Sequence, residues 1–177
     1  SGNAIQLTVI NAIAPTEGPG GPVLVLSKSG NPYSRYPVEI LRAQGLNAFS
    51  AIDISALNST ILNNHDVVIL GEMSLTGTEL TLLTNWVNAG GTLVALRPDA
   101  QLAGLLGLTP TGNHLSDKYL LLNTATGPGA GIVNQTIQYH GTADLYTLNG
   151  ATAIATLYSD ATTATTYPAV TSKQVGA

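Results

Sequence analysis

Cysteine is entirely absent from the 177-residue sequence. Its absence excludes disulfide bonds, thiolate nucleophiles and cysteine-ligated zinc. No apolar run approaches the roughly 18 residues that a membrane-spanning helix needs, so we expect no membrane span. The three histidines, His65, His114 and His140, are scattered along the chain. We therefore expect neither a metal site nor a cofactor.

Charged residues are also scarce, at 9% of the sequence against about 25% in a typical globular protein. The net charge of -4, with only six Lys plus Arg, gives no basic patch for nucleic acid. Hydrophobic residues nevertheless reach 44%, which argues against disorder and allows a sizeable core. The polar surface must come from Thr, Asn, Ser and Gly. This composition suits a secreted or cell-surface protein.

Three segments are expected along the chain. Residues 1–14 contain an alternating apolar stretch, which predicts a strand. That strand is either the tail of a preceding domain or an edge strand of this domain or of a neighbouring molecule. Residues 15–22 are a Pro/Gly linker expected to pack against nothing. Residues 23–177 form the main domain, and a strand-like start at 168–171 indicates that this domain is truncated at its C-terminus.

The first part of the main domain alternates between strands and helices. A helix capped by Ser34 follows the first strand. A later helix begins with a capping box of Thr76 and Glu79 and ends at Gly90-Gly91. Such alternation makes right-handed βαβ crossovers, so we predict an α/β fold with a doubly wound, mainly parallel sheet and flanking helices. The expected buried strands are 23–26, 47–52, 67–70 and 92–96.

The pattern changes after Thr109. Short strands are predicted at 119–122, 137–140 and 152–158, set in loops rich in Gly and Thr. Residues 161–166 (ATTATT) are predicted to be a surface loop. We therefore expect a mainly β C-terminal extension to the sheet.

One segment of the α/β part resembles a known family. Leu75-Thr76 followed by WVNAGGTLV, which starts at Trp86, is similar to the helix–Gly-Gly–strand segment of class I glutamine amidotransferase-like (flavodoxin-like) domains. The nearest group is the ThuA-like (trehalose utilisation) group. The resemblance covers residues 23–107 and implies the fold more specifically than the activity. Similar segments occur in non-catalytic domains of secreted bacterial multidomain proteins.

The resemblance also bears on catalysis. In amidotransferases the strand after the glycine pair ends in a nucleophilic cysteine on a tight turn, and the resemblance places Arg97 at that position. Arginine stays protonated and cannot attack a carbonyl. Pro98 removes a backbone N–H that an oxyanion hole would use. The resemblance therefore implies a catalytically silent member of the family.

Polar side chains follow the predicted parallel strands at their carboxyl ends, where open α/β sheets bind ligands. Glu72 and Arg97 end the third and fourth strands and are expected to lie close together. They predict either a structural ion pair that fills the crevice or a site for a small polar ligand, such as a sugar. The expected ligand-binding residues are Glu72, Arg97, Asp99, Asn31 and Arg35; Lys28, Ser29, Tyr33, Ser34 and Asp53 are expected at the same edge.

A second cluster runs from His140 to Asp144. A histidine and an aspartate four residues apart can orient an imidazole beside a serine such as Ser29 or Ser34. This predicts a carbohydrate- or ester-directed hydrolase that uses His140, Asp144 and Glu72. However, the sequence contains no Gly-x-Ser-x-Gly elbow, and a loop histidine bonded to backbone is the alternative.

Three functional hypotheses follow. The first is a non-catalytic structural or binding module of a secreted or cell-surface bacterial protein, whose partners are other domains of the same polypeptide or neighbouring subunits. The second is the hydrolase. The third is a filament or assembly subunit whose N-terminal strand pairs with a neighbour.

Overall fold

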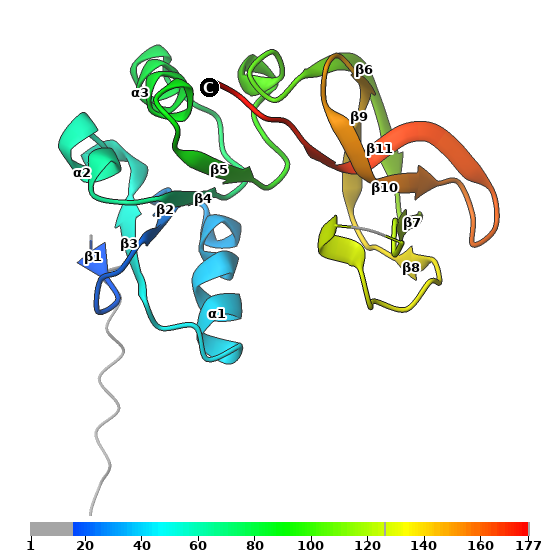
Figure 1. Ribbon diagram of the computed structural model, residues 1–177, viewed down its shortest axis with the longest axis horizontal. Coiled ribbons are helices and arrows are strands. Elements are labelled where there is room, and N and C mark those ends of the chain that lie inside the picture. The colour runs from blue at the N-terminus through cyan, green and yellow to red at the C-terminus, as the bar shows by residue number, and fades with distance from the viewer. Residues whose placement is uncertain (1–15, 126, 177) are drawn as a thin grey trace, which may run out of the picture.

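The computed structural model describes residues 16–125 and 127–176, so the strand predicted within residues 1–14 lies outside the described residues. The first half of the chain forms a five-stranded sheet, and the second half forms two antiparallel sheets beside it (Figure 1). Among the described residues, no helix is long and apolar enough to cross a membrane.

Four parallel strands make the centre of the larger sheet. β2 pairs with β3 on one side and with β4 on the other, and β5 pairs with β4. The predicted parallel strands are thus present, and the fold is mixed α/β. Their bounds are β2 (Val23–Ser27), β3 (Phe49–Asp53), β4 (Val67–Leu70) and β5 (Thr92–Ala95).

The short strand β1 (Thr16–Glu17) pairs antiparallel with β3 at the edge of this sheet. It lies in the segment that the sequence predicted to pack against nothing, and that expectation is wrong for these residues. The turn after β1 brings two backbones together. Gly18 has φ 90°, and a Cβ there would clash with the carbonyl of Phe49. Only glycine tolerates both constraints.

Helices cover both faces of the parallel sheet (Figure 1). Successive strand residues point to opposite faces. Leu24 therefore packs in the core that contains Leu83 of α3, whereas Val25 packs in the core that contains Val38 of α1. The α-helices are α1 (Tyr36–Ala43), α2 (Ser59–Asn63) and α3 (Gly77–Asn88), and the 3-10 turns are η1 (Pro32–Arg35), η2 (Ile54–Ala56), η3 (Ala100–Leu102) and η4 (Gly127–Gly129).

The helix caps follow the sequence prediction in one case and depart from it in another. At α3 the Glu79 N–H donates to Thr76 Oγ1, and the Thr76 N–H donates to the Glu79 carboxylate at 2.7 Å, so the predicted capping box is confirmed. Ser34 does not cap α1, because it lies within η1 and is fully buried. Arg35 occupies the cap position of α1, and its side chain makes no capping hydrogen bond to that helix.

The mainly β C-terminal extension is present, but its strands do not prolong the parallel sheet. Within the described residues they pair with one another, all antiparallel. Residues 164–166, predicted to be loop, belong to a strand instead, because β-branched threonine suits a half-buried strand. The strands are β6 (Leu108–Ser116) paired with β9 (Thr142–Leu148), and a sheet of β7 (Tyr119–Leu122), β8 (Ile137–Gln138), β10 (Thr152–Tyr158) and β11 (Ala164–Ser172).

The β5 edge of the parallel sheet carries no further strand within the described residues. Although the sequence predicted a buried strand here, Thr92 and Val94 are exposed, and so is Leu96 just after the strand. A mostly apolar groove of about 800 Å³ runs between this edge and residues 168–175.

Candidate functional site

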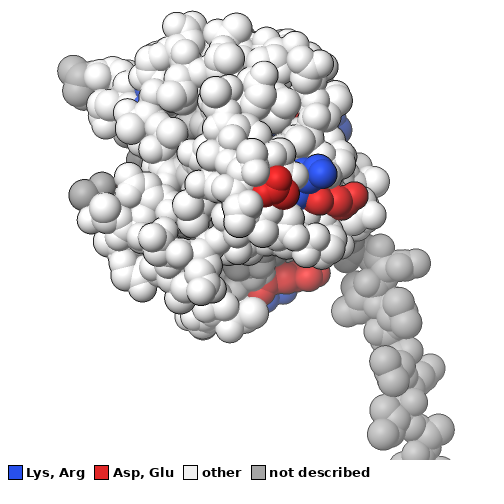
Figure 2. All heavy atoms as spheres, turned by 90° about the vertical axis from the view of Figure 1, so that its right-hand side faces the viewer, with Lys and Arg blue, Asp and Glu red and all other residues white. Residues whose placement is uncertain are grey.

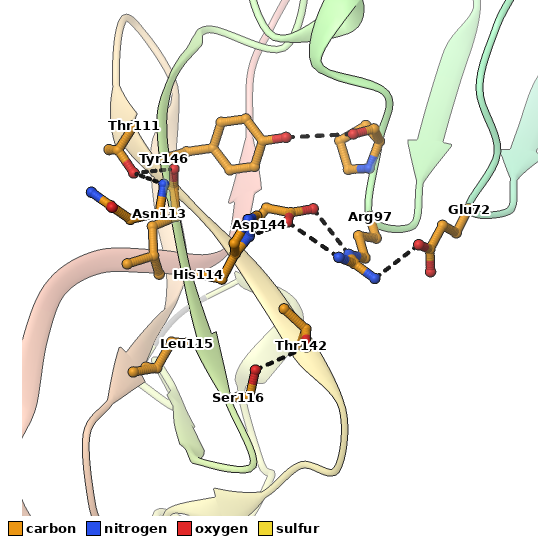
Figure 3. A network of polar contacts seen from close by, with 12 residues as sticks. Glu72, Arg97, Thr111, Asn113, His114, Leu115, Ser116, Thr142, Asp144 and Tyr146 are labelled. Atoms are coloured by element: carbon orange, nitrogen blue, oxygen red, sulfur yellow. Dashed lines mark hydrogen bonds and ion pairs between the residues drawn. The ribbon is translucent and has the colours of Figure 1, made fainter.

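A second, polar groove of about 740 Å³ lies at the carboxyl ends of β4 and β5, between the parallel sheet and the β6–β9 pair. Glu72 follows β4, Arg97 follows β5 and Asp144 reaches toward them from β9 (Figure 3). This is the edge at which the sequence predicted a ligand crevice. Charged side chains are sparse on the face that Figure 2 shows, and the most prominent of them form clusters of acidic and basic groups.

Arg97 connects the two halves of the chain. Its Nη1 donates to Glu72 Oε1 at 2.8 Å. Its Nε and Nη2 donate to Asp144 Oδ2 at 2.9 Å and to Oδ1 at 3.2 Å. The expected proximity of Glu72 and Arg97 is therefore observed, and Asp144 adds a two-point contact of the kind that a planar guanidinium favours.

The pKa values of this cluster reflect the same bonds. The hydrogen bond to Asp144 raises the pKa of Arg97, and the hydrogen bonds from Arg97 lower the pKa of Asp144. Burial raises the pKa of the neighbouring Tyr146, and the Asp144 charge adds to that effect. Tyr146 donates from its hydroxyl to the Pro98 carbonyl at 3.4 Å, as Figure 3 shows. Arg97 and Asp144 thus hold each other in their charged forms.

The backbone at Arg97 is unusual. Its φ is 45°, in the left-handed region that costs a residue with a Cβ roughly 1–2 kcal/mol. The turn comes directly after β5, where the Leu96 N–H makes a last bond to the Leu70 carbonyl. Its effect is to direct the guanidinium across the groove toward Asp144 (Figure 3).

His114 on β6 is the remaining member of the network. His114 and Asp144 are register partners on adjacent strands, and the His114 Nδ1 lies 2.8 Å from Asp144 Oδ1. The His114 side chain is 58% exposed. The sequence prediction left His114 aside, because Pro110 and Gly112 interrupt the alternation that would have revealed β6. Had β6 and β9 been predicted as partners, the two residues would have been placed together.

Two predicted residues lie away from this network. His140 is exposed in the loop before β9 and does not line the polar groove. Asp144, expected to work with it, instead binds Arg97 and His114. Arg35 sits at the N-terminus of α1 and does not line the groove either.

Asp99 and Asn31 do line the groove, but much of their bonding capacity serves the fold. Asp99 caps η3 by accepting from the Gln101 N–H at 2.9 Å and also accepts from the Leu75 N–H at 2.9 Å. Burial opposes its ionisation, yet these backbone bonds lower the pKa of Asp99. Asn31 Nδ2 donates to the Glu72 carbonyl at 2.6 Å. Both residues thereby fix the loops around the groove.

The loop after β2 is held by its own polar side chains. Ser34 accepts from the Lys28 N–H at 2.9 Å and donates to the Asn31 carbonyl at 2.6 Å. The Ser29 N–H donates to the Asp53 carboxylate at 2.6 Å, and hydrogen bonds from Ser55, first among them that of its hydroxyl, lower the pKa of Asp53. Ser34 is therefore committed to the loop. In the described part of the chain no cluster of three or more His, Asp or Glu side chains could hold a metal ion.

Comparison with protein families and with curated proteins gives no match. Solved structures do match. A β-galactosidase from Bacillus circulans sp. alkalophilus superposes with a TM-score of 0.67 at 14% identity, over 88% of this chain and 27% of that one. An α-L-fucosidase isoenzyme 2 from Paenibacillus thiaminolyticus gives 0.68 at 15% identity, over 87% and 28%. A putative ThuA-like protein from Bacteroides uniformis gives 0.64 at 11% identity, over 86% and 77%.

These likenesses concern the fold alone, because the identities are low. They extend over most of the described chain, and therefore over antiparallel strands as well as the parallel sheet. The chain spans less than a third of the length of the two glycosidases. It spans about three quarters of the length of the ThuA-like protein, with which it shares a similar fold.

Proposed function

We propose that this chain is a non-catalytic structural or binding module of a secreted or cell-surface bacterial protein. It is built on a doubly wound, amidotransferase-like (flavodoxin-like) core nearest to the ThuA-like group. The parallel strands, the helices on both faces of their sheet and the likeness to a ThuA-like protein support this core. The likeness to parts of much longer glycosidases supports a role beside other domains of one polypeptide, in a carbohydrate-related setting.

The observation that carries the proposal is the state of Arg97. The sequence resemblance implies that Arg97 takes the position of the amidotransferase nucleophile. In the structure it lies on a left-handed turn and presents a cation bound to two carboxylates. A guanidinium so held neither attacks a carbonyl nor takes up a proton. Its ion pairs instead connect Asp144 on β9 with Glu72 after β4, across the polar groove.

An activity screen tests this proposal directly. Nitrophenyl glycosides, nitrophenyl esters and glutamine are offered to the wild-type chain and to Arg97→Ala and Glu72→Ala. We expect no turnover above buffer for any of the three proteins. Turnover by the wild type that either substitution abolishes would overturn the proposal. Glu39→Gln, an exposed change on α1, is the matched control for a contaminating activity.

A hydrolase is the second candidate, because the bond between His114 Nδ1 and Asp144 is the arrangement that orients an imidazole as a general base. In this version His114 replaces the His140 that the sequence suggested. The shared bonding of Asp144 to Arg97 argues against it, since the carboxylate is already neutralised. An ester-hydrolysis rate that rises with pH and disappears in His114→Ala would favour the hydrolase over the binding module.

A further inference from the structure

We infer that the polar groove at Arg97 binds a neutral, hydroxyl-rich ligand of the saccharide class rather than an anion or an organic cation. This inference rests on the proposed binding role and specifies its ligand. The groove volume of about 740 Å³ falls within the roughly 300–1,000 Å³ typical of small-molecule sites.

Anions are disfavoured by the charges that face the groove. Arg97 is the sole Lys or Arg among the described residues that line it, against the three carboxylates of Glu72, Asp99 and Asp144. Two of these carboxylates already neutralise the guanidinium. An incoming carboxylate or phosphate would meet a net negative wall, and it would find only the two remaining N–H donors of a guanidinium whose charge is already balanced.

Organic cations are disfavoured because the carboxylate oxygens are occupied. Both oxygens of Asp144 accept from Arg97 or His114. Both oxygens of Asp99 accept from N–H groups of the protein. Of the three groove carboxylates, only Glu72 offers an oxygen without a bond from another described residue, and its side chain is 53% exposed. A single hydrated oxygen attracts an ammonium group weakly.

The bonding groups that remain include both donors and acceptors. A guanidinium has five N–H donors, and Arg97 spends three of them on Glu72 and Asp144. His114 keeps its second ring nitrogen, since Nδ1 faces Asp144. Glu72 contributes an acceptor oxygen. A sugar hydroxyl both donates and accepts, so neighbouring hydroxyls of one ring can satisfy such a mixed surface without any charge of their own.

An aromatic wall completes the fit. Tyr33 lines the groove and is 65% exposed, and its ring packs edge-on against Tyr36 with centroids 5.5 Å apart. The contact with Tyr36 restrains the ring, and most of the Tyr33 side chain remains exposed. Exposed aromatic faces of this kind suit the apolar C–H face of a pyranose, while the polar groups across the groove suit its hydroxyls.

Saturation-transfer NMR with defined sugars tests the inference. The neutral probes are lactose, cellobiose and mannobiose, and the charged comparators are glucuronic acid and glucosamine. We expect transfer to at least one neutral disaccharide and markedly less to both charged sugars. Tyr33→Ala should weaken the affinity for that disaccharide by about three- to tenfold, and His114→Ala should weaken it similarly. Glu39→Gln on α1 should leave it unchanged.

Three outcomes would overturn the inference: no transfer to any neutral probe at millimolar concentration, stronger transfer to a charged sugar, or equal affinity in Tyr33→Ala. Circular dichroism of each variant confirms that the exposed substitutions leave the fold intact. The NMR spectra of the sugar also separate this inference from the proposed function. Release of free monosaccharide from a bound disaccharide would overturn the non-catalytic role while leaving the ligand class standing, whereas absence of binding without hydrolysis would overturn only the ligand class.

Discussion

Replacing Arg97 by alanine should loosen the attachment of the β6–β9 pair to the parallel sheet. The change removes one hydrogen bond to Glu72 and two to Asp144. The Glu72 side chain is 53% exposed, so this arm is worth about 0.5 kcal/mol, as exposed ion pairs are. Asp144 is 25% exposed and bound at two points, which places its arm at about 1–2 kcal/mol. We expect a total loss of about 2 kcal/mol in the free energy of unfolding.

The backbone at this position refines the prediction. Arg97 has φ 45°, and alanine suffers the same left-handed strain as arginine. Glycine does not, so Arg97→Gly should be more stable than Arg97→Ala by up to about 1 kcal/mol. An order in which alanine is the more stable of the two would show that the turn is not strained.

Two double-mutant cycles, measured by urea unfolding, separate the contact of Arg97 with Asp144 from its contact with Glu72. Arg97→Ala is combined with Asp144→Asn in one cycle and with Glu72→Gln in the other. The coupling energy with Asp144 should be the larger, because Asp144 is less exposed to solvent than Glu72 and accepts two hydrogen bonds from Arg97. Additive effects, within about 0.3–0.5 kcal/mol, in the Asp144 cycle would refute the role of Arg97 as the fastener between the two halves, and so would a larger coupling with Glu72.

Three other measurements probe separate parts of the molecule. Arg97 lowers the pKa of Asp144 below its ordinary 3.8, so the ionised carboxylate stabilises the fold above that pH, and this contribution is lost as the pH falls through the lower folded-state pKa. Between about pH 6 and about pH 2.5, the free energy of urea unfolding should therefore fall more for the wild type than for Asp144→Asn. Equal losses would contradict this. Leu83→Ala, in the fully buried face of α3, should cost about 2–5 kcal/mol in thermal unfolding, while Asn85→Ala on the exposed face of the same helix should stay within about 0.5 kcal/mol. Thr76→Ala should cost about 1 kcal/mol through the lost cap, and Thr76→Ser should retain most of that stability in the same assay.

The parallel core could be predicted from local patterns because each of its elements carries its own signal. The strand at Val67–Leu70 matched the prediction, since a short β-branched run bounded by polar residues has few alternatives. The capping box of Thr76 and Glu79 likewise fixed the start of α3. Where the prediction failed, at Ser34, a tertiary contact decided: the serine is enclosed by the backbone of Lys28 and Asn31.

Only half of the polar cluster could be predicted in the same way. Glu72 and Arg97 were expected together because neighbouring parallel strands end at one edge of a sheet. His114 and Asp144, which are 30 residues apart in the chain, reach that edge through the pairing of β6 with β9. That pairing has an irregularity in register between Pro110 and His114. Periodicity within a strand says nothing about its partner, so this part of the cluster had to come from the three-dimensional structure.

The edge at β5, which pairs with no further strand in the part of the chain that the structure describes, affects how the chain can associate with other proteins. Proteins usually protect such edges with lysine, proline or a bulge, yet the stretch from Ala89 to Leu96 contains no charge and no proline. Its backbone donors and acceptors, flanked by exposed Val94 and Leu96, form a template for a strand from elsewhere. If further domains accompany this chain in one polypeptide, a strand from one of them can add to the sheet at this edge. We expect any self-association of the isolated chain to increase with protein concentration and to fall when β5 is covered.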